Sequence, residues 1–246
     1  MRKIIVAVMF AVLPLVGFAA EEGAHLDKAH VDLSDKASLQ RGAKFFINNC
    51  LSCHSAKYMR YNRMGKDLGI PDDVLKKNFL ALPTQKVGDT MSISMAPANA
   101  ENFFGKQPPD LSVIARRRGA DWLYTYFKSF YIDESRPFGV NNAVFKDVGM
   151  PDVFWNWEGM KKPVYETVTV NGEKEQVIKD FEYVSKGSMT PAEFDKTMHD
   201  LTNFMVYMGE PIRMERQRIG IWVLGFLAVF FVFAYLLKRE YWKDVH

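Results

Sequence analysis

Two cysteines and a histidine stand within five residues, Cys50-Leu51-Ser52-Cys53-His54, and the 246-residue chain contains no other cysteine. This spacing is typical of a c-type haem attachment site, where each thiol adds to one vinyl group and the imidazole reaches the iron. A redox dithiol would require a βαβ context, and a zinc site would require a second pair of ligands. The sequence therefore predicts a single covalent haem c, held by Cys50, Cys53 and His54.

The N-terminal segment predicts an export signal. A positively charged start precedes an apolar run over residues 4–18, and small residues follow at the spacing of a cleavage site. Because the run is short and is interrupted by Pro14, an uncleaved membrane anchor is the weaker interpretation. We expect residues 1–19 to be a signal peptide, with the exact cleavage site left open, and residues 20–212 to form an exported haem-binding domain.

The C-terminal segment predicts a membrane span. Residues 219–237 are nineteen residues without a charge. At 1.5 Å per residue they would cover roughly 28 Å, close to the hydrocarbon thickness of about 30 Å. Basic residues flank both sides, so the export signal rather than the charge bias sets the orientation. We expect residues 213–246 to supply one transmembrane anchor and a short cytoplasmic tail.

The segment between the two ends reads as mainly helical. Gly and Pro punctuate a loop-rich stretch over residues 83–109, and Asn171-Gly172 predicts the turn of a β-hairpin over residues 164–184. The fold class predicted is mainly α: a cytochrome c-like haem domain with loop and β-hairpin insertions, plus one C-terminal transmembrane helix. Helical periodicity marks three segments of the soluble part, residues 38–49, 110–130 and 191–209.

The charge and the polar residues of the chain do not indicate nucleic-acid binding or acid–base catalysis. The formal net charge is +3 and the soluble part contains no clustered basic stripe, so nucleic acid is not an expected partner. No convincing acid–base pair is evident, and we expect no substrate chemistry in this chain alone.

The second axial ligand of the iron is expected downstream. Met150 fits best on local grounds, because Gly149 lets the backbone approach closely and Pro151 stiffens that approach. Met95 is the rival, and a His–His or five-coordinate iron is a further alternative. Three methionines at helical spacing are better explained as core residues, namely Met198, Met205 and Met208.

Taken together, these features resemble the cytochrome c1 family, the haem subunit of the ubiquinol–cytochrome c reductase complex, in a bacterial form. The resemblance covers nearly the whole chain, and the Pro-Pro-Asp-Leu-Ser segment followed by a single tail anchor is its most specific part. The matching pieces are Cys50–His54, Ala98-Asn99-Ala100, Pro108-Pro109-Asp110-Leu111-Ser112, Val148-Gly149-Met150-Pro151 and Gly209-Glu210-Pro211.

The resemblance implies a set of haem contacts. His54 and Met150 would be the axial ligands of the iron, and Arg118 would pair with a haem propionate, with Arg116 and Arg117 as alternatives on the same segment. A planar guanidinium matches a carboxylate in geometry and charge. Two features differ from the family: the approach to the methionine, residues 141–147, is not Gly-Pro-rich, and the cysteine pair outside the haem site of some members is absent.

The resemblance also implies a function. The chain would be a one-electron carrier that accepts electrons from the Rieske iron–sulfur protein and passes them to cytochrome c. It would sit beside cytochrome b in the bacterial inner membrane, as part of a dimeric complex, with its haem domain in the periplasm. The alternatives are a free-standing, membrane-anchored cytochrome c that feeds a terminal oxidase and, from another class, a haem-based sensor or binding module.

Overall fold

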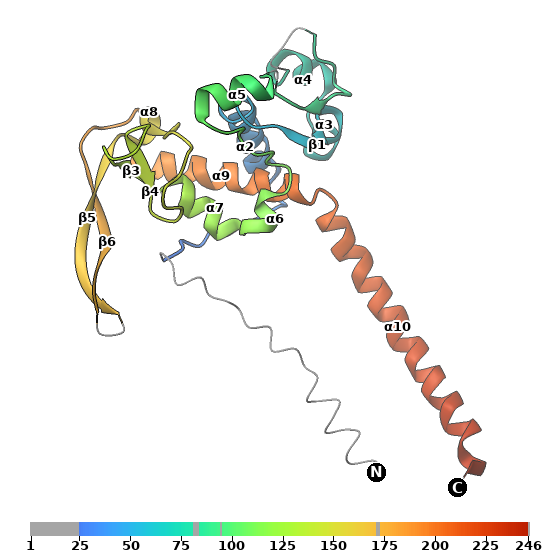
Figure 1. Cartoon of the computed structure of the whole chain (residues 1–246). Coiled ribbons are helices and arrows are strands. Elements are labelled where there is room, and N and C mark those ends of the chain that lie inside the picture. Colours follow the sequence, from blue (N-terminus) through green and yellow to red (C-terminus); the bar gives the residue numbers. More distant parts are fainter. Residues whose placement is uncertain (1–24, 81–83, 94, 171–172, 246) are drawn as a thin grey trace.

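The computed structural model describes residues 25–80, 84–93, 95–170 and 173–245. Figure 1 shows a helical body, a long two-stranded hairpin projecting from one side and a single C-terminal helix that leaves the body. The predicted signal peptide, residues 1–19, and the predicted hairpin turn at Asn171-Gly172 lie outside the described residues.

Two helices from opposite ends of the domain, α2 (Lys36–Asn49) and α9 (Pro191–Gly209), pack side by side. Gly42 permits their close approach, since a Cβ built there would lie 2.0 Å from the Asp200 carbonyl oxygen. The ring centroids of Phe46 and Phe204 lie 5.6 Å apart across the contact. Beside them, the Arg41 guanidinium donates to both carboxylate oxygens of Asp200, at 2.6 and 2.9 Å.

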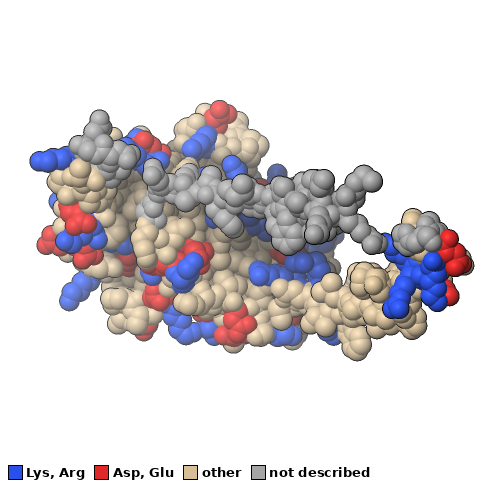
Figure 2. Space-filling model, turned by 90° about the horizontal axis from the view of Figure 1, so that it is seen from below, with Lys and Arg blue, Asp and Glu red and all other residues tan. Residues whose placement is uncertain are grey.

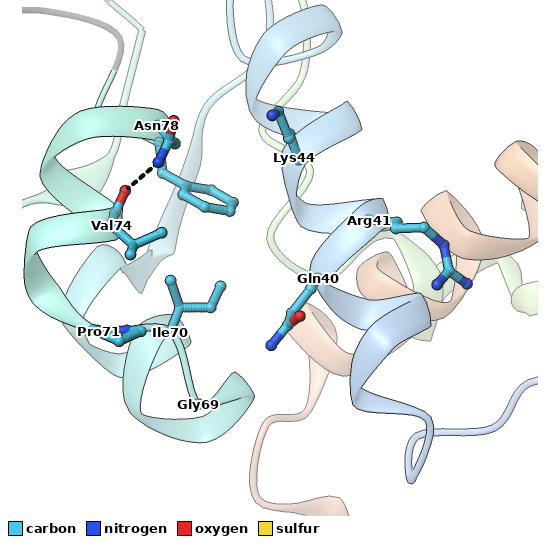
Figure 3. Close-up of a pocket in the computed structure, with 9 residues that line it drawn as sticks. Gln40, Arg41, Lys44, Gly69, Ile70, Pro71, Val74 and Asn78 are labelled. Atoms are coloured by element: carbon cyan, nitrogen blue, oxygen red, sulfur yellow. Dashed lines mark hydrogen bonds between the residues drawn. The ribbon is translucent and has the colours of Figure 1, made fainter.

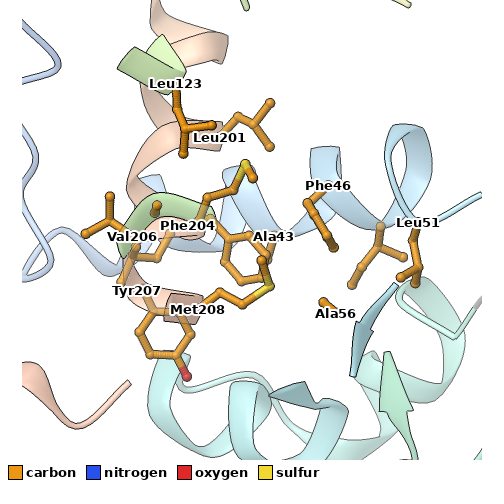
Figure 4. Packing of buried hydrophobic residues seen from close by; sticks show 14 of the residues in the cluster. Ala43, Phe46, Leu51, Ala56, Leu123, Leu201, Phe204, Val206, Tyr207 and Met208 are labelled. Carbon is orange, nitrogen blue, oxygen red and sulfur yellow. The ribbon is translucent and has the colours of Figure 1, made fainter. Parts of the chain in front are cut away.

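The hydrophobic core follows this helix pair (Figure 4). Phe46 and Ala43 of α2 face Phe204 and Met208 of α9, and Leu123 joins them from a neighbouring helix. The three methionines expected in the core are all buried there, which confirms that expectation for Met198, Met205 and Met208.

Both helices begin where their capping residues predict. The Asp35 carboxylate accepts a hydrogen bond from the Ser38 amide at 2.9 Å and caps α2. Thr190 and Glu193 form a reciprocal capping box at the start of α9, which satisfies two amides that the helix cannot. These caps explain why the predicted bounds of residues 38–49 and 191–209 match the observed helices closely.

The helix predicted over residues 110–130 is divided in two. Gly119, with φ of 91°, separates α6 (Ile114–Arg118) from α7 (Ala120–Phe127). Only a residue without a Cβ adopts this conformation readily, so the chain changes direction there. The last residue of the predicted helix, Phe130, instead begins a strand, β3 (Phe130–Ile132), which pairs antiparallel with β4 (Val140–Asn142).

The remaining small elements surround this framework. Strands β1 and β2 pair antiparallel, and short helices connect the loop-rich segments. Their bounds are β1 Ala56–Arg60, α3 Tyr61–Leu68, α4 Asp72–Asn78, β2 Thr90–Met91, α5 Pro97–Phe104, α8 Trp155–Glu158 and the 3₁₀ turn η1 Lys243–Val245.

The projecting hairpin consists of β5 (Lys161–Val170) and β6 (Glu173–Tyr183), which confirms the predicted hairpin. A buried ion pair anchors its base, where the Lys161 ammonium contacts the Glu158 carboxylate and the Lys128 carbonyl oxygen. The same ammonium lies 4.8 Å from the ring centroid of Phe181. A two-stranded hairpin is only marginally stable alone, so this buried base attaches it to the body.

The C-terminal helix α10 (Arg213–Tyr241) contains the predicted span, residues 219–237, and extends beyond it at both ends. It is long and apolar enough to cross a membrane, and none of its apolar window is buried against the rest of the chain.

On the face seen from below in Figure 2, positive and negative side chains are mixed across the body.

We expect Gly42→Ala to destabilise the protein. A methyl group at this position collides with the backbone of α9, and the overpacking outweighs the gain in helix propensity. The expected loss of about 2–3 kcal/mol corresponds to a fall of roughly 5–10 °C in the thermal midpoint of the haem protein in detergent.

Gly88→Ala is the matched control, because a Cβ there meets no atom within 4 Å and the φ angle is not positive. Its thermal midpoint should change little. Equal midpoints for both variants would contradict the proposed role of the α2–α9 approach.

Candidate haem site

The C-terminal end of α2 presents the two cysteines. Cys50 is the C-cap residue, and its amide donates to the Phe46 carbonyl oxygen at 2.8 Å. The amides of Cys53 and His54 both donate to the Cys50 carbonyl oxygen, at 3.1 and 2.9 Å. The two thiols and the imidazole therefore belong to one tight turn fixed to the end of a packed helix. Burial, and secondarily the charge of Cys53, raises the pKa of the Cys50 thiol to about 12.

The His54 ring is oriented by a backbone carbonyl. Its Nδ1 lies 2.8 Å from the Pro109 carbonyl oxygen and donates to it, since a carbonyl only accepts. This bond fixes the tautomer and leaves Nε2 with a free lone pair, which is the arrangement that metal-ligating histidines use. Burial lowers the pKa of His54 and favours the neutral ring. The imidazole is thus prepared to bind iron through Nε2.

The Pro-Pro-Asp-Leu-Ser segment acts as a clamp on the residues that follow His54. The Leu111 amide donates to the Ser55 carbonyl oxygen at 2.8 Å. The Lys57 amide donates to the Asp110 carboxylate at 3.0 Å, and the Tyr58 amide donates to the Ser112 hydroxyl at 3.1 Å. The segment singled out by the sequence therefore has a physical role: it fixes the strand after the attachment turn and supplies the carbonyl that orients His54.

Met150 lies against the same core as the attachment turn. Both Cys50 and Met150 are partly buried against the main hydrophobic cluster. The segment after Met150 packs on α2, where the ring centroid of Phe45 lies 6.4 Å from that of Phe154 and 5.1 Å from that of Trp157. The Met150 sulfur accepts a hydrogen bond from the Tyr126 hydroxyl at 3.3 Å. Met95, the rival, lies in the irregular segment before α5.

Asn142 holds the loop that leads to Met150. Its side-chain oxygen accepts from the amides of Val144 and Phe145, at 3.1 and 3.2 Å, and from the Ser129 hydroxyl at 3.1 Å. Its side-chain nitrogen donates to the Tyr126 carbonyl oxygen at 2.8 Å. The Asn142 side chain is buried, and its bonds to Tyr126 and Ser129 attach the loop to the end of α7.

Asn141 holds the other side of the same loop. Its side-chain oxygen accepts from the Asp147 amide, and its side-chain nitrogen donates to the Asp133 carboxylate, both at 2.9 Å. Asp147 also pairs with Arg136 at 3.0 Å. The segment that departs from the family pattern is therefore closed by side-chain amides and one ion pair.

Arg118 lies at the end of a row of rings that reaches Met150. Its guanidinium carbon is 4.9 Å from the ring centroid of Trp122 and 5.4 Å from that of Phe145. Trp122 in turn stacks on Tyr126. Arg116 lies elsewhere, since a Cβ built at Gly209 would be 3.3 Å from its Cγ. Within the described residues no carboxylate pairs with any of the three arginines, Arg116, Arg117 and Arg118.

Sequence reasoning missed two residues of this site. The sequence marks Tyr126 only as one residue of the helix predicted over 110–130, and Asn142 only as one residue of the atypical segment 141–147. The spacing of Arg118, Trp122 and Tyr126, four residues apart each time, is the signal from which a common row could have been predicted. Nothing local marks Asn142 as a link to α7, because Tyr126 and Ser129 lie 16 and 13 residues before it.

A separate surface pocket of about 440 Å³ lies between α2 and the α3–α4 corner. Figure 3 shows Gln40 and Lys44 of α2 facing Ile70 and Val74. The pocket involves neither the attachment turn nor Met150. In the part of the chain that the structure describes, no three His, Cys, Asp or Glu side chains are grouped to hold a further metal ion.

The donor set fits an iron porphyrin. The two thiols at attachment spacing would bond the vinyl groups, and the free imidazole nitrogen and the thioether sulfur are donors that suit haem iron rather than a hard cation. The chain is therefore a membrane-anchored c-type cytochrome. More specifically, it belongs to the cytochrome c1 family, whose model matches residues 27–245.

The relatives of the chain include two proteins named cytochrome c1 and one with a different name. The chain is 48% identical to cytochrome c1 of Allochromatium vinosum, over the full length of both chains. It is 44% identical to a protein named ammonia monooxygenase gamma subunit of Nitrosomonas europaea, over all of this chain and 98% of that one. It is also 27% identical to cytochrome c1 of Blastochloris viridis, over 86% and 82% of the two chains.

Membership in this family defines the general function. Cytochrome c1 is the haem subunit of the bc1 complex, carries a covalently bound haem c and is anchored in the membrane. Three predictions from the sequence are thereby confirmed: the resemblance to the cytochrome c1 family, the fold class and the covalent haem c. The family also implies the context of a complex with cytochrome b and a Rieske protein.

We expect Asn142→Ala to loosen the loop before Met150. The substitution removes four hydrogen bonds of a buried side chain and leaves the part-buried amides of Val144 and Phe145 without this acceptor, at a cost of about 3 kcal/mol. The thermal midpoint of the haem protein should fall by roughly 6–12 °C. Trypsin should also cut faster after Lys146, which lies in this loop.

Asn78→Ala is the control, because the exposed Asn78 amide donates only one long bond, 3.3 Å to the Val74 carbonyl oxygen. Its midpoint should shift by no more than about 1–2 °C. Unchanged trypsin cleavage in Asn142→Ala would show that the amide does not hold the loop.

Proposed function

We propose that Cys50 and Cys53 bind the haem through thioethers and that His54 and Met150 are the axial ligands of its iron. The observation that carries this assignment is the His54 ring, whose Nδ1 is engaged by Pro109 while Nε2 remains free at the end of the attachment turn. The haem supplies a one-electron couple between ferrous and ferric iron. A methionine ligand raises the reduction potential of such a couple relative to a second histidine.

We further propose that Arg118 pairs with a haem propionate. Its support is positional: of the three adjacent arginines, Arg118 lies on the row of rings that ends at Met150, whereas Arg116 lies against the end of α9. A guanidinium held over two rings keeps its N–H groups in a fixed plane, and that plane can meet a carboxylate in a bidentate fashion.

In this function the protein side chains position and shield rather than react. The clamp at residues 108–112 holds the His54 side of the site, and the Asn141–Asn142 loop holds the Met150 side. His54 and Met150, held in place by these contacts, would bind the iron in the same positions in both oxidation states. The chain itself makes and breaks no substrate bond.

We propose the following path and topology. Electrons arrive from the Rieske protein and leave to a cytochrome c, in a dimeric complex of the bacterial inner membrane. Residues 1–19 are a signal peptide, residues 20–212 form the periplasmic haem domain, and residues 213–246 supply the anchor with a cytoplasmic tail. The family match favours this function over a free-standing cytochrome and over a haem sensor.

Met150→Leu tests the ligand assignment. The haem should stay covalently bound, while the weak far-red absorption band of methionine-ligated ferric haem disappears. The reduction potential should fall by on the order of a few tenths of a volt, because axial ligands tune haem potentials over about 0.8 V. Optical spectra and a redox titration of the purified protein measure both effects.

Met95→Leu is the matched control and should leave the band and the potential unchanged. The opposite pattern, with the band lost in Met95→Leu and kept in Met150→Leu, would transfer the ligand role to Met95.

Co-purification tests the assembly. After extraction in mild detergent, an affinity-tagged chain should bring down a cytochrome b and a Rieske protein in equal stoichiometry. A chain recovered alone, with its haem intact, would favour the free-standing cytochrome.

A further inference from the structure

We propose that Tyr126 is a positioning residue for Met150, whose hydroxyl orients the thioether sulfur and raises the reduction potential of the haem. The proposal rests on the assignment of Met150 as an axial ligand. The contact that carries it is the bond from the Tyr126 hydroxyl to the Met150 sulfur, at 3.3 Å. Met150 is the one hydrogen-bond partner recorded for this hydroxyl among the described residues.

The Tyr126 ring is held on several sides, so its hydroxyl has a fixed direction. The ring stacks on Trp122, with centroids 4.9 Å apart and planes 11° apart. It meets Phe130 edge-on at 5.1 Å and Phe127 edge-on at 5.9 Å. Its own backbone carbonyl is fixed as well, since it accepts from Asn142. A ring clamped in this manner loses little further freedom when its hydroxyl contacts Met150.

The row of rings continues away from Met150 to the surface. The Arg118 guanidinium lies over Trp122, and Phe145 meets Trp122 edge-on at 6.1 Å. Phe145 belongs to the loop that Asn142 holds, so the row and the loop stabilise each other. Tyr126 thus connects both supports of the site to the sulfur of Met150.

The chemistry follows from the two lone pairs of a thioether sulfur. One pair binds iron and the other accepts the phenol hydrogen bond, which withdraws electron density from the sulfur. A weaker donor stabilises ferrous iron relative to ferric iron, so the bond raises the reduction potential. It also restrains rotation of the long, flexible methionine side chain, which has three rotatable bonds.

Tyr126→Phe removes the hydroxyl and keeps the ring and its stacking. At a fixed ambient potential, the ratio of ferrous to ferric protein should fall roughly threefold to tenfold, which for a one-electron couple is a midpoint about 30–60 mV lower. The far-red methionine band should remain but shift, because the ligand stays bound with altered electron density.

Two comparisons distinguish this role from a merely structural one. Tyr124→Phe, on the same helix, removes a hydroxyl that donates to Asp195 at 2.6 Å and should leave the haem potential unchanged. In the Met150→Leu background, Tyr126→Phe should no longer move the potential, because the sulfur through which it acts is gone.

The outcomes separate the two proposals. If Met150→Leu abolishes the far-red band while Tyr126→Phe leaves potential and band unaltered, Met150 is the ligand and the role of Tyr126 is refuted. An equal shift from Tyr126→Phe in both backgrounds also refutes it, because the effect then does not pass through Met150. A band that survives Met150→Leu overturns the ligand assignment and this inference with it.

Discussion

The contact between α2 and α9 at Gly42 is the constraint on which the rest of the structure depends. α2 ends at Cys50, so the position of this helix determines where the attachment turn lies. α9 packs against α6 and α7 on its other side and continues into α10. The attachment turn, the aromatic row and the membrane span are far apart in sequence. Each of them is attached to one of the two helices that cross at Gly42.

The two sides of the haem site are built by different physical means. On the His54 side, the amides of Lys57, Tyr58 and Leu111 donate to the Asp110 carboxylate, the Ser112 hydroxyl and the Ser55 carbonyl oxygen, and the His54 ring donates to the Pro109 carbonyl oxygen. The Met150 side relies on buried side chains, with Asn142 closing the loop and Tyr126 contacting the sulfur.

The parts that sequence reasoning predicted are those with local signals. The attachment turn depends on spacing alone, and α9 begins and ends at its capping box and at Gly209. The predicted helix over residues 110–130 ran through Gly119 and wrongly included Phe130, the first residue of β3, because the partner strand β4 begins ten residues further on. The roles of Asn142 and Tyr126 could not be predicted, since their partners are 16 and 24 residues away and no periodicity records such contacts.

The amide-closed loop has a consequence for how such a chain matures. With two cysteines in all, one disulfide is conceivable, between Cys50 and Cys53 themselves. No scrambled isomer can arise in an oxidising compartment, and a single reduction returns both thiols to the form that reacts with vinyl groups. Because Asn141 and Asn142 close the methionine loop without a disulfide, both cysteines of the chain serve haem attachment.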